Sequence, residues 1–168
     1  MTIPVRSVTI SLLFLAAAAH AQSKDEEVNR YIRNLKSSEP ATRKAAAEGI
    51  GKVAQIKVSA AKPALQPLIE ALADPSPTVR AAVANALAKL DEPKQVVPVL
   101  IKVVKEDTDN SVRMAAATGL GLIGEPAREA VPALRALMRD AKSDEQKRMA
   151  RIAGEAIRQI TGANRKKP

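Results

Sequence analysis

Apolar and small residues recur along this chain at the spacing of one helix face. In the segments 42–53, 79–90 and 112–123 they fall at i, i+3, i+4, i+7, i+8 and i+11, and a fourth copy begins at Met149. This 3.6-residue period predicts helices that each bury one face. The four copies begin 37, 33 and 37 residues apart, so the pattern predicts a repeat architecture.

A second amphipathic segment precedes each of these helices, with Leu68 and Leu72 in the second unit and Leu100 and Val104 in the third. We therefore predict helix A, a turn and helix B, four times over. The fold class is all-α, an α-solenoid of four helical hairpins. The expected helices cover residues 25–36, 40–57, 60–73, 77–90, 93–105, 110–123, 126–139 and 144–160.

Turn-forming residues support these boundaries. Pro40 and Pro77 are expected in the first turn of a B helix, where a missing N–H costs nothing. The segment 143–146 has the pattern of a capping box, and Gly124 and Gly162 follow apolar runs as C-terminal caps.

Prolines also recur inside the expected A helices, at Pro67, Pro98 and Pro132. A proline in a helix interior removes a hydrogen bond and bends the helix. We therefore predict a bend at one place per unit, repeated through the array.

The composition agrees with helices and removes several chemistries. Of the 168 residues 46% are hydrophobic but only 1% aromatic, which disfavours a sheet. The chain has no cysteine, which excludes disulfides, thiolate zinc sites and a cysteine nucleophile. We expect no catalytic residue, metal site or cofactor.

Residues 1–21 have the pattern of a secretory signal peptide: one early positive charge, an apolar run over 8–19, and small residues at the end. The run is too short to cross a membrane. We expect export to the periplasm or beyond, a repeat domain over residues 22–162, and a basic disordered tail over 163–168. The alternative is an ordinary first helix or an uncleaved anchor.

The stretches 68–80 and 125–134 resemble HEAT repeats, especially the short, phycocyanobilin-lyase-type HEAT-like variety. The resemblance covers residues 25–162 and implies a protein-binding scaffold whose B helices line a concave surface. It also implies that an aspartate caps each turn and that an arginine six residues later bonds to it and to the adjacent unit. The residues given this structural role are Asp74, Arg80, Asp107 and Arg113. The alternative is a row of arginines for an anionic ligand.

The expected solvent face of the B helices carries small and partly apolar side chains in the central units, and such patches can mark a partner site. The alternative is that the larger ones are half-buried. The candidate partner-binding residues are Ala81, Asn85, Lys89, Met114, Thr118 and Leu122. The expected non-core positions in these two units also include Ala84 and Ala117.

Positive charge gathers in residues 128–168, with 11 basic and 5 acidic residues. Such a region can attract a polyanion, although a solvated helix face with a frayed tail is the favoured explanation. Specific nucleic-acid binding is not expected, because no aromatic residue is near for stacking. The candidate anion-binding residues are Arg151, Arg158, Arg165, Lys166 and Lys167.

We therefore expect a non-enzymatic module of the bacterial envelope that binds another protein and is monomeric or weakly self-associating. The competing hypothesis is an accessory enzyme of the HEAT-like hydroxylase or lyase type. The hydroxylases bind two irons through His–Glu pairs, whereas the one histidine here, His20, lies in the expected signal peptide. A third hypothesis is a polyanion-binding module.

Overall fold

The computed structural model describes residues 25–139 and 142–162, and every regular element within them is a helix. This confirms the all-α fold class. The expected signal peptide over 1–21 and the expected tail over 163–168 lie outside the described residues. Residues 25–34 are helical. The elements that follow are α2 (Pro40–Ile56), α3 (Val58–Ala61), η1 (Lys62–Ala64), α4 (Leu65–Ala71), α5 (Pro77–Leu87), α6 (Pro93–Glu106), α7 (Asn110–Ile123), η2 (Glu125–Ala130), α8 (Val131–Ala136) and α9 (Asp144–Thr161).

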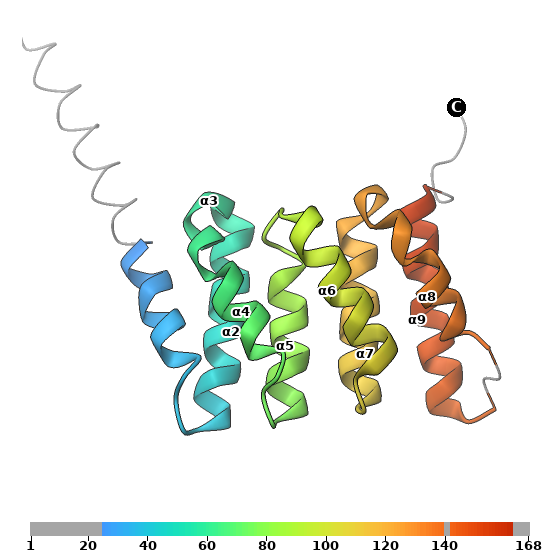
Figure 1. Ribbon diagram of the computed structural model, residues 1–168, viewed down its shortest axis with the longest axis horizontal. Helices are drawn as coiled ribbons and strands as arrows, with labels where there is room; N and C mark the ends of the chain where they lie inside the picture. Colours follow the sequence, from blue (N-terminus) through green and yellow to red (C-terminus); the bar gives the residue numbers. More distant parts are fainter. Residues whose placement is uncertain (1–24, 140–141, 163–168) are drawn as a thin grey trace, which may run out of the picture.

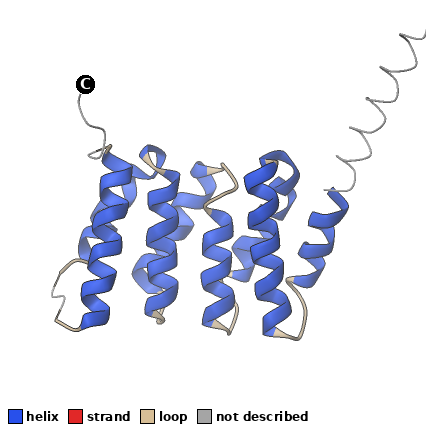
Figure 2. Ribbon diagram, turned by 180° about the vertical axis from the view of Figure 1, so that it is seen from behind, coloured by secondary structure: helices blue, strands red, loops and turns tan. Residues whose placement is uncertain are grey.

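The helices form two rows (Figure 1). One row holds the B helices α2, α5, α7 and α9, and each of these contacts the next. The other row holds α4, α6 and α8, which cross in front of the first row in Figure 1. Figure 2 shows the array from behind, with the B helices side by side toward the viewer. The array is the α-solenoid that the periodicity predicts.

One continuous core runs between the two rows. Leu68, Leu100 and Leu134 occupy equivalent places in the second, third and fourth A helices, and all three are fully buried. Burying one such side chain contributes about 1.5–3 kcal/mol. Because every unit contributes to the same core, no unit has a separate interior of its own.

Local signals set the helix ends. Pro40 and Pro77 begin α2 and α5, and the Asp109 side chain accepts hydrogen bonds from two backbone N–H groups at the start of α7. Ser143 and Gln146 form the predicted capping box of α9, and Gly162 ends that helix with a φ of 71°. These caps supply partners for backbone groups that a helix leaves unpaired.

Of the three prolines expected inside A helices, only Pro98 lies in a helix interior, in α6. In the second unit the A segment is divided into α3, η1 and α4, and Pro67 falls in the first turn of α4. In the fourth unit η2 precedes α8, and Pro132 is near the start of α8. A proline is tolerated in a first turn, so the chain restarts a helix there instead of bending one.

Glycines bring neighbouring B helices close together. A Cβ placed on Gly121 in α7 would lie 2.9 Å from the Cα of Ala156 in α9, and one on Gly51 in α2 would lie 3.4 Å from the Cα of Ala86 in α5. Gly119 in α7 also meets α5, because a Cβ placed on it would lie 3.0 Å from the Cβ of Ala88. Gly124 makes no such contact and ends α7 with a φ of 75°.

Candidate functional site

The turns between helices A and B are joined from unit to unit by arginine–aspartate pairs. Arg80 donates from Nε and Nη2 to the two carboxylate oxygens of Asp107 in the next unit, at 2.8 Å each. Its Nη1 donates to the backbone oxygen of Asp74 in its own turn, at 2.9 Å. Asp74 and Asp107 each also accept a backbone N–H two residues ahead.

Arg43 repeats this arrangement one unit earlier. Its Nε and Nη2 donate to Asp74 at 2.6 and 2.9 Å, and its Nη1 donates to the backbone oxygens of Ser37 and Ser38 at 2.9 Å. Sequence reasoning left Arg43 out because Ser37 stands where later units have aspartate. The turn needs only a backbone oxygen at that place, so alignment of Arg43 with Arg80 is the signal that finds it.

Arg113 differs from these two arginines. It donates from Nε to the backbone oxygen of Val104 at 3.0 Å, and its Nη1 lies 3.4 Å from Oδ1 of Asn110. Within the described part of the chain it binds no carboxylate.

The paired groups titrate away from their usual values. The Arg43 guanidinium holds the pKa of the Asp74 carboxyl below its ordinary value, and Arg80 does the same to the pKa of Asp107. The carboxylates are 6% and 9% exposed, and each is engaged by both a guanidinium and a backbone N–H. These arginines join the units, so they are not open to an anionic ligand.

A groove crosses α2, α5 and α7 on the B-helix row, with a volume of about 420 Å³. We call it the B-helix groove. Of the predicted partner-binding residues, Asn85, Lys89, Thr118 and Leu122 line it, whereas Ala81 and Met114 do not. Its complete lining is Ala47, Glu48, Gly51, Lys52, Gln55, Ala82, Asn85, Ala86, Ala88, Lys89, Thr118, Gly119 and Leu122.

The larger apolar residues expected on this face have different environments. Leu122 is 61% exposed, while Met114 is half-buried against the core. Ala84 and Ala117 are fully buried, contrary to their expected place on the solvent face. The reason is the close approach of neighbouring B helices, which covers the small residues between them.

The groove residues occupy equivalent places in successive repeats. Lys52, Lys89 and Leu122 share one repeat position and so form a row across α2, α5 and α7. A second row, one turn earlier in each helix, is Glu48, Asn85 and Thr118. Sequence reasoning did not single out Lys52 or Gln55 for binding, although the shared register of Lys52 with Lys89 identifies it.

The charged residues of the groove are unevenly neutralised. The ammonium of Lys44, beside the groove, lies 3.6 Å from Oε1 of Glu48. No acidic group of the described residues pairs with Lys52 or Lys89. The stem of Lys89 lies over α2, because a Cβ on Gly51 would be 3.5 Å from its Cδ. The rim is therefore positive, and the floor consists of alanine and glycine.

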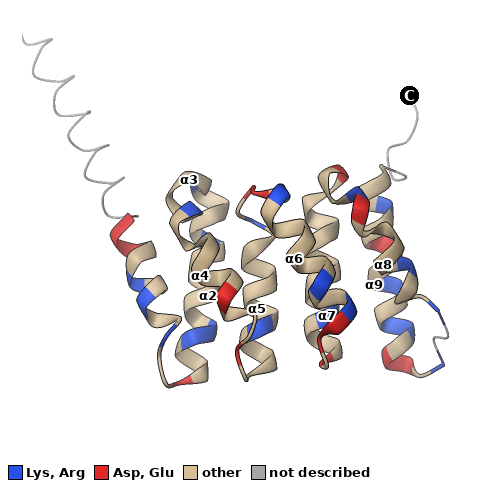
Figure 3. Ribbon diagram, in the orientation of Figure 1, with Lys and Arg blue, Asp and Glu red and all other residues tan. Residues whose placement is uncertain are grey.

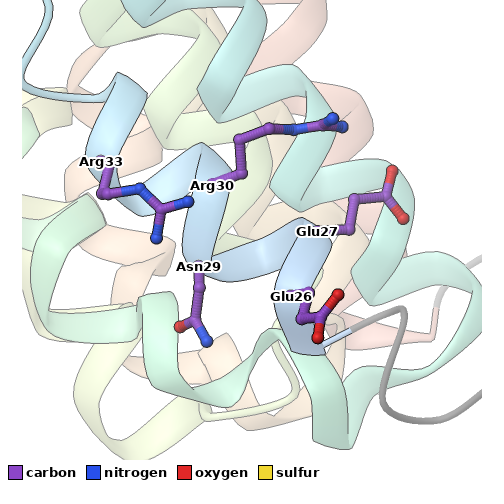
Figure 4. Close-up of a pocket in the computed structure, with 5 residues that line it drawn as sticks. All are labelled: Glu26, Glu27, Asn29, Arg30 and Arg33. Atoms are coloured by element: carbon purple, nitrogen blue, oxygen red, sulfur yellow. The ribbon is translucent and has the colours of Figure 1, made fainter.

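Other hollows have less to hold a ligand. One lies between α4 and α6 on the opposite row and is lined mainly by aliphatic side chains such as Ile69, Leu72 and Val99. Another is formed by Glu26, Glu27, Asn29, Arg30 and Arg33 on the first helix alone (Figure 4). In Figure 4 these side chains point in different directions and do not converge on one place.

The candidate anion-binding residues fall in two groups. Arg158 donates from Nε to Oε2 of Glu155 at 3.0 Å, whereas Arg151 is exposed and has no ion pair with a described residue. Figure 3 shows basic residues spaced along α9. The other three candidates, Arg165, Lys166 and Lys167, lie outside the described residues.

Neither a metal cluster nor a membrane span is found in residues 25–139 and 142–162. No three or more histidine, cysteine, aspartate or glutamate side chains there could hold a metal ion together. No described helix is both long and apolar enough to cross a bilayer.

Comparison with known families gives one match. A sequence profile described as HEAT repeats matches residues 28–98 and 65–154, which together span most of the chain. No curated protein sequence matches it.

Proposed function

Because this chain belongs to the HEAT-repeat family, we propose that it is a non-catalytic scaffold that binds another protein through the B-helix groove. HEAT repeats are commonly protein-interaction modules, and their arrays are typically not catalytic. The observation that carries the proposal is a groove across three stacked helices, with an exposed leucine at one end and paired polar rows along it.

The stacked helices explain how such a scaffold works. Each B helix is held on the next by close glycine and alanine contacts and by a shared core, so the groove residues are fixed relative to one another. A rigid surface loses little conformational freedom when a partner binds, which favours affinity.

We place this scaffold in the bacterial envelope. The support is the signal-peptide pattern of residues 1–21, which lies outside the described residues. The repeat spacing of 33 to 37 residues supports assignment to the short, phycocyanobilin-lyase-type variety.

The test compares two matched substitutions of exposed aliphatic residues. Leu122→Lys places a charge in the B-helix groove, and Ile56→Lys makes the same kind of change at a residue that is 73% exposed and outside the groove. In affinity capture from an envelope extract, we expect Leu122→Lys to lose proteins that the parent chain and Ile56→Lys both retain.

Circular dichroism checks that all three proteins are folded. Equal recovery of every captured protein by Leu122→Lys and Ile56→Lys would contradict binding at the groove. Stoichiometric iron in the purified protein would contradict the non-catalytic assignment.

A further inference from the structure

The polar groups of the B-helix groove have unused binding capacity. Lys52 and Lys89 have no ion-pair partner among the described residues, and the Asn85 and Gln55 amides have no hydrogen-bond partner there. The carboxylate of Glu48 is engaged by Lys44. The groove thus offers two ammonium groups and two amides without a partner among the described residues, while its one carboxylate is already paired with Lys44.

The amides indicate the conformation of the occupant. An α-helix satisfies its own backbone N–H and C=O groups, whereas an extended chain leaves them available. The Asn85 and Gln55 side chains each offer two N–H donors and an acceptor oxygen. They are therefore complementary to the backbone of an extended segment lying across the helices.

The repeat spacing sets the order of side chains on that segment. Packed helices lie about 8–10 Å apart, so the row Lys52, Lys89 and Leu122 spans about 20 Å. This is the length of about six extended residues. The two lysines are adjacent in the row and Leu122 is at its end. A segment lying along the row would therefore contact the two positive charges on α2 and α5 and then the leucine on α7.

We infer that the B-helix groove binds an extended acidic segment of a partner protein, with carboxylates at Lys52 and Lys89 and an apolar side chain at Leu122. The inference rests on the proposed function, because it specifies the chemistry of the partner at the same groove. The floor of alanine and glycine leaves room for the backbone of the segment to approach α2 and α5 closely.

The test uses three fluorescein-labelled dodecapeptides with the full-length chain, measured by fluorescence anisotropy. In the first peptide aspartate alternates with alanine, and near the C-terminus two leucines take the place of aspartate in this alternation. The second replaces every aspartate by asparagine, and the third replaces it by lysine. We expect the aspartate peptide to bind most tightly, and its affinity to fall with added salt, because exposed charge pairs are screened.

Lys52→Gln/Lys89→Gln should weaken binding of the aspartate peptide about 3- to 30-fold, as expected for the loss of two exposed ion pairs. Lys52→Glu/Lys89→Glu should reverse the preference toward the lysine peptide. Arg148→Gln/Arg151→Gln removes the same charge from the candidate anion-binding region on α9. The matched control is Lys94→Gln/Lys105→Gln, which removes it from exposed positions on α6 outside the groove. This control should keep the affinity within about twofold.

Several results would overturn the inference. Equal binding of all three peptides would do so. Weaker binding by Arg148→Gln/Arg151→Gln together with unchanged binding by Lys52→Gln/Lys89→Gln would also do so. The latter result would assign the acidic peptide to the basic C-terminal region. If Leu122→Lys still loses its captured partner, the groove remains the binding surface and only the acidic chemistry is wrong.

Discussion

The Arg80–Asp107 pair shows how one side chain can join two repeats. A guanidinium has five N–H donors in a planar fork, so it can reach a carboxylate and backbone oxygens at once. Arg80 uses this geometry to connect the turn at Asp74 with the carboxylate of the next unit. The same bonds at Arg43 show that the connection depends on turn geometry more than on an aspartate in its own turn.

We predict that Asp107→Asn lowers the free energy of unfolding at pH 7 by about 1–3 kcal/mol, the usual range for a hydrogen bond to a charged group. Asparagine keeps an acceptor oxygen for the Asp109 N–H, but it removes the charge and replaces the oxygen that accepts from Nε of Arg80 by an NH₂ donor. Because Arg80 lowers the pKa of folded Asp107, the ion pair stabilises the protein above the unfolded pKa of about 4. Its contribution is lost as the pH falls through the lower, folded-state pKa.

Urea unfolding at several pH values, followed by circular dichroism, measures this difference. The gap between parent and Asp107→Asn should shrink below about pH 4. Glu106→Gln is the control, because its carboxylate is 62% exposed and 4.0 Å from Lys102, and such a pair contributes under about 1 kcal/mol. A pH-independent gap would show that the charge is not the cause.

At the scale of elements, the B helices are spaced by their smallest residues. Gly121 faces the backbone of Ala156 across the α7–α9 contact. Gly154, in the same α9 helix, can admit a methyl group, because the nearest atom to a Cβ placed there would be at the ordinary contact distance of 3.7 Å. Gly121 is therefore needed for the packing of α7 against α9, whereas Gly154 only lowers the helix propensity of α9.

We predict that Gly121→Ala destabilises the protein by about 1–3 kcal/mol through overpacking, since α9 must move to admit the methyl group. Gly154→Ala should instead stabilise it by up to about 1 kcal/mol, because alanine favours a helix over glycine. Thermal unfolding of both variants measures the two effects. Stabilisation of the protein by Gly121→Ala would refute the close α7–α9 contact.

At the scale of the whole molecule, stability is shared between neighbouring units. The central helices α5 and α7 each contact a B helix on both sides, whereas the helix over 25–34 packs at one end of the described array (Figure 1). In an array of this kind, stability is approximately a sum of unit and nearest-neighbour terms. Local opening should therefore begin at the ends.

We predict that backbone amides in α5 and α7 exchange with solvent most slowly, and that those of residues 25–34 exchange fastest among the helices. Val28, which is 1% exposed, provides the variant. Val28→Ala should speed exchange in the first helix and leave α7 and α9 unchanged. Hydrogen–deuterium exchange read by mass spectrometry gives these rates, and uniform acceleration along the whole chain would contradict nearest-neighbour coupling.

Much of the fold could be predicted, because a repeated sequence presents the same helical period several times. The expected start of α6 at residue 93 and the boundaries of α7 agree with the structure. The A segments of the second and fourth units could not be placed as well. Their prolines are compatible with both a bent helix and a restarted one, and long-range packing selects between them.

The candidate groove was predictable only in part. Register alone places Lys89 and Leu122 on one row of the B helices, and both line the groove. The position of a residue in the repeat does not give the distance between neighbouring B helices. Ala84 and Ala117 are buried because small residues let neighbouring helices meet, and that contact involves residues far apart in the sequence.

From its residues alone, this chain predicts four helical units, their caps and the core positions of the large aliphatic residues, because helical period and capping are local properties. The tertiary structure decided which carboxylate each arginine binds. Arg43 and Arg80 reach carboxylates 31 and 27 residues away, and the groove is built from three helices. These features depend on the distance between stacked units, which no local pattern encodes.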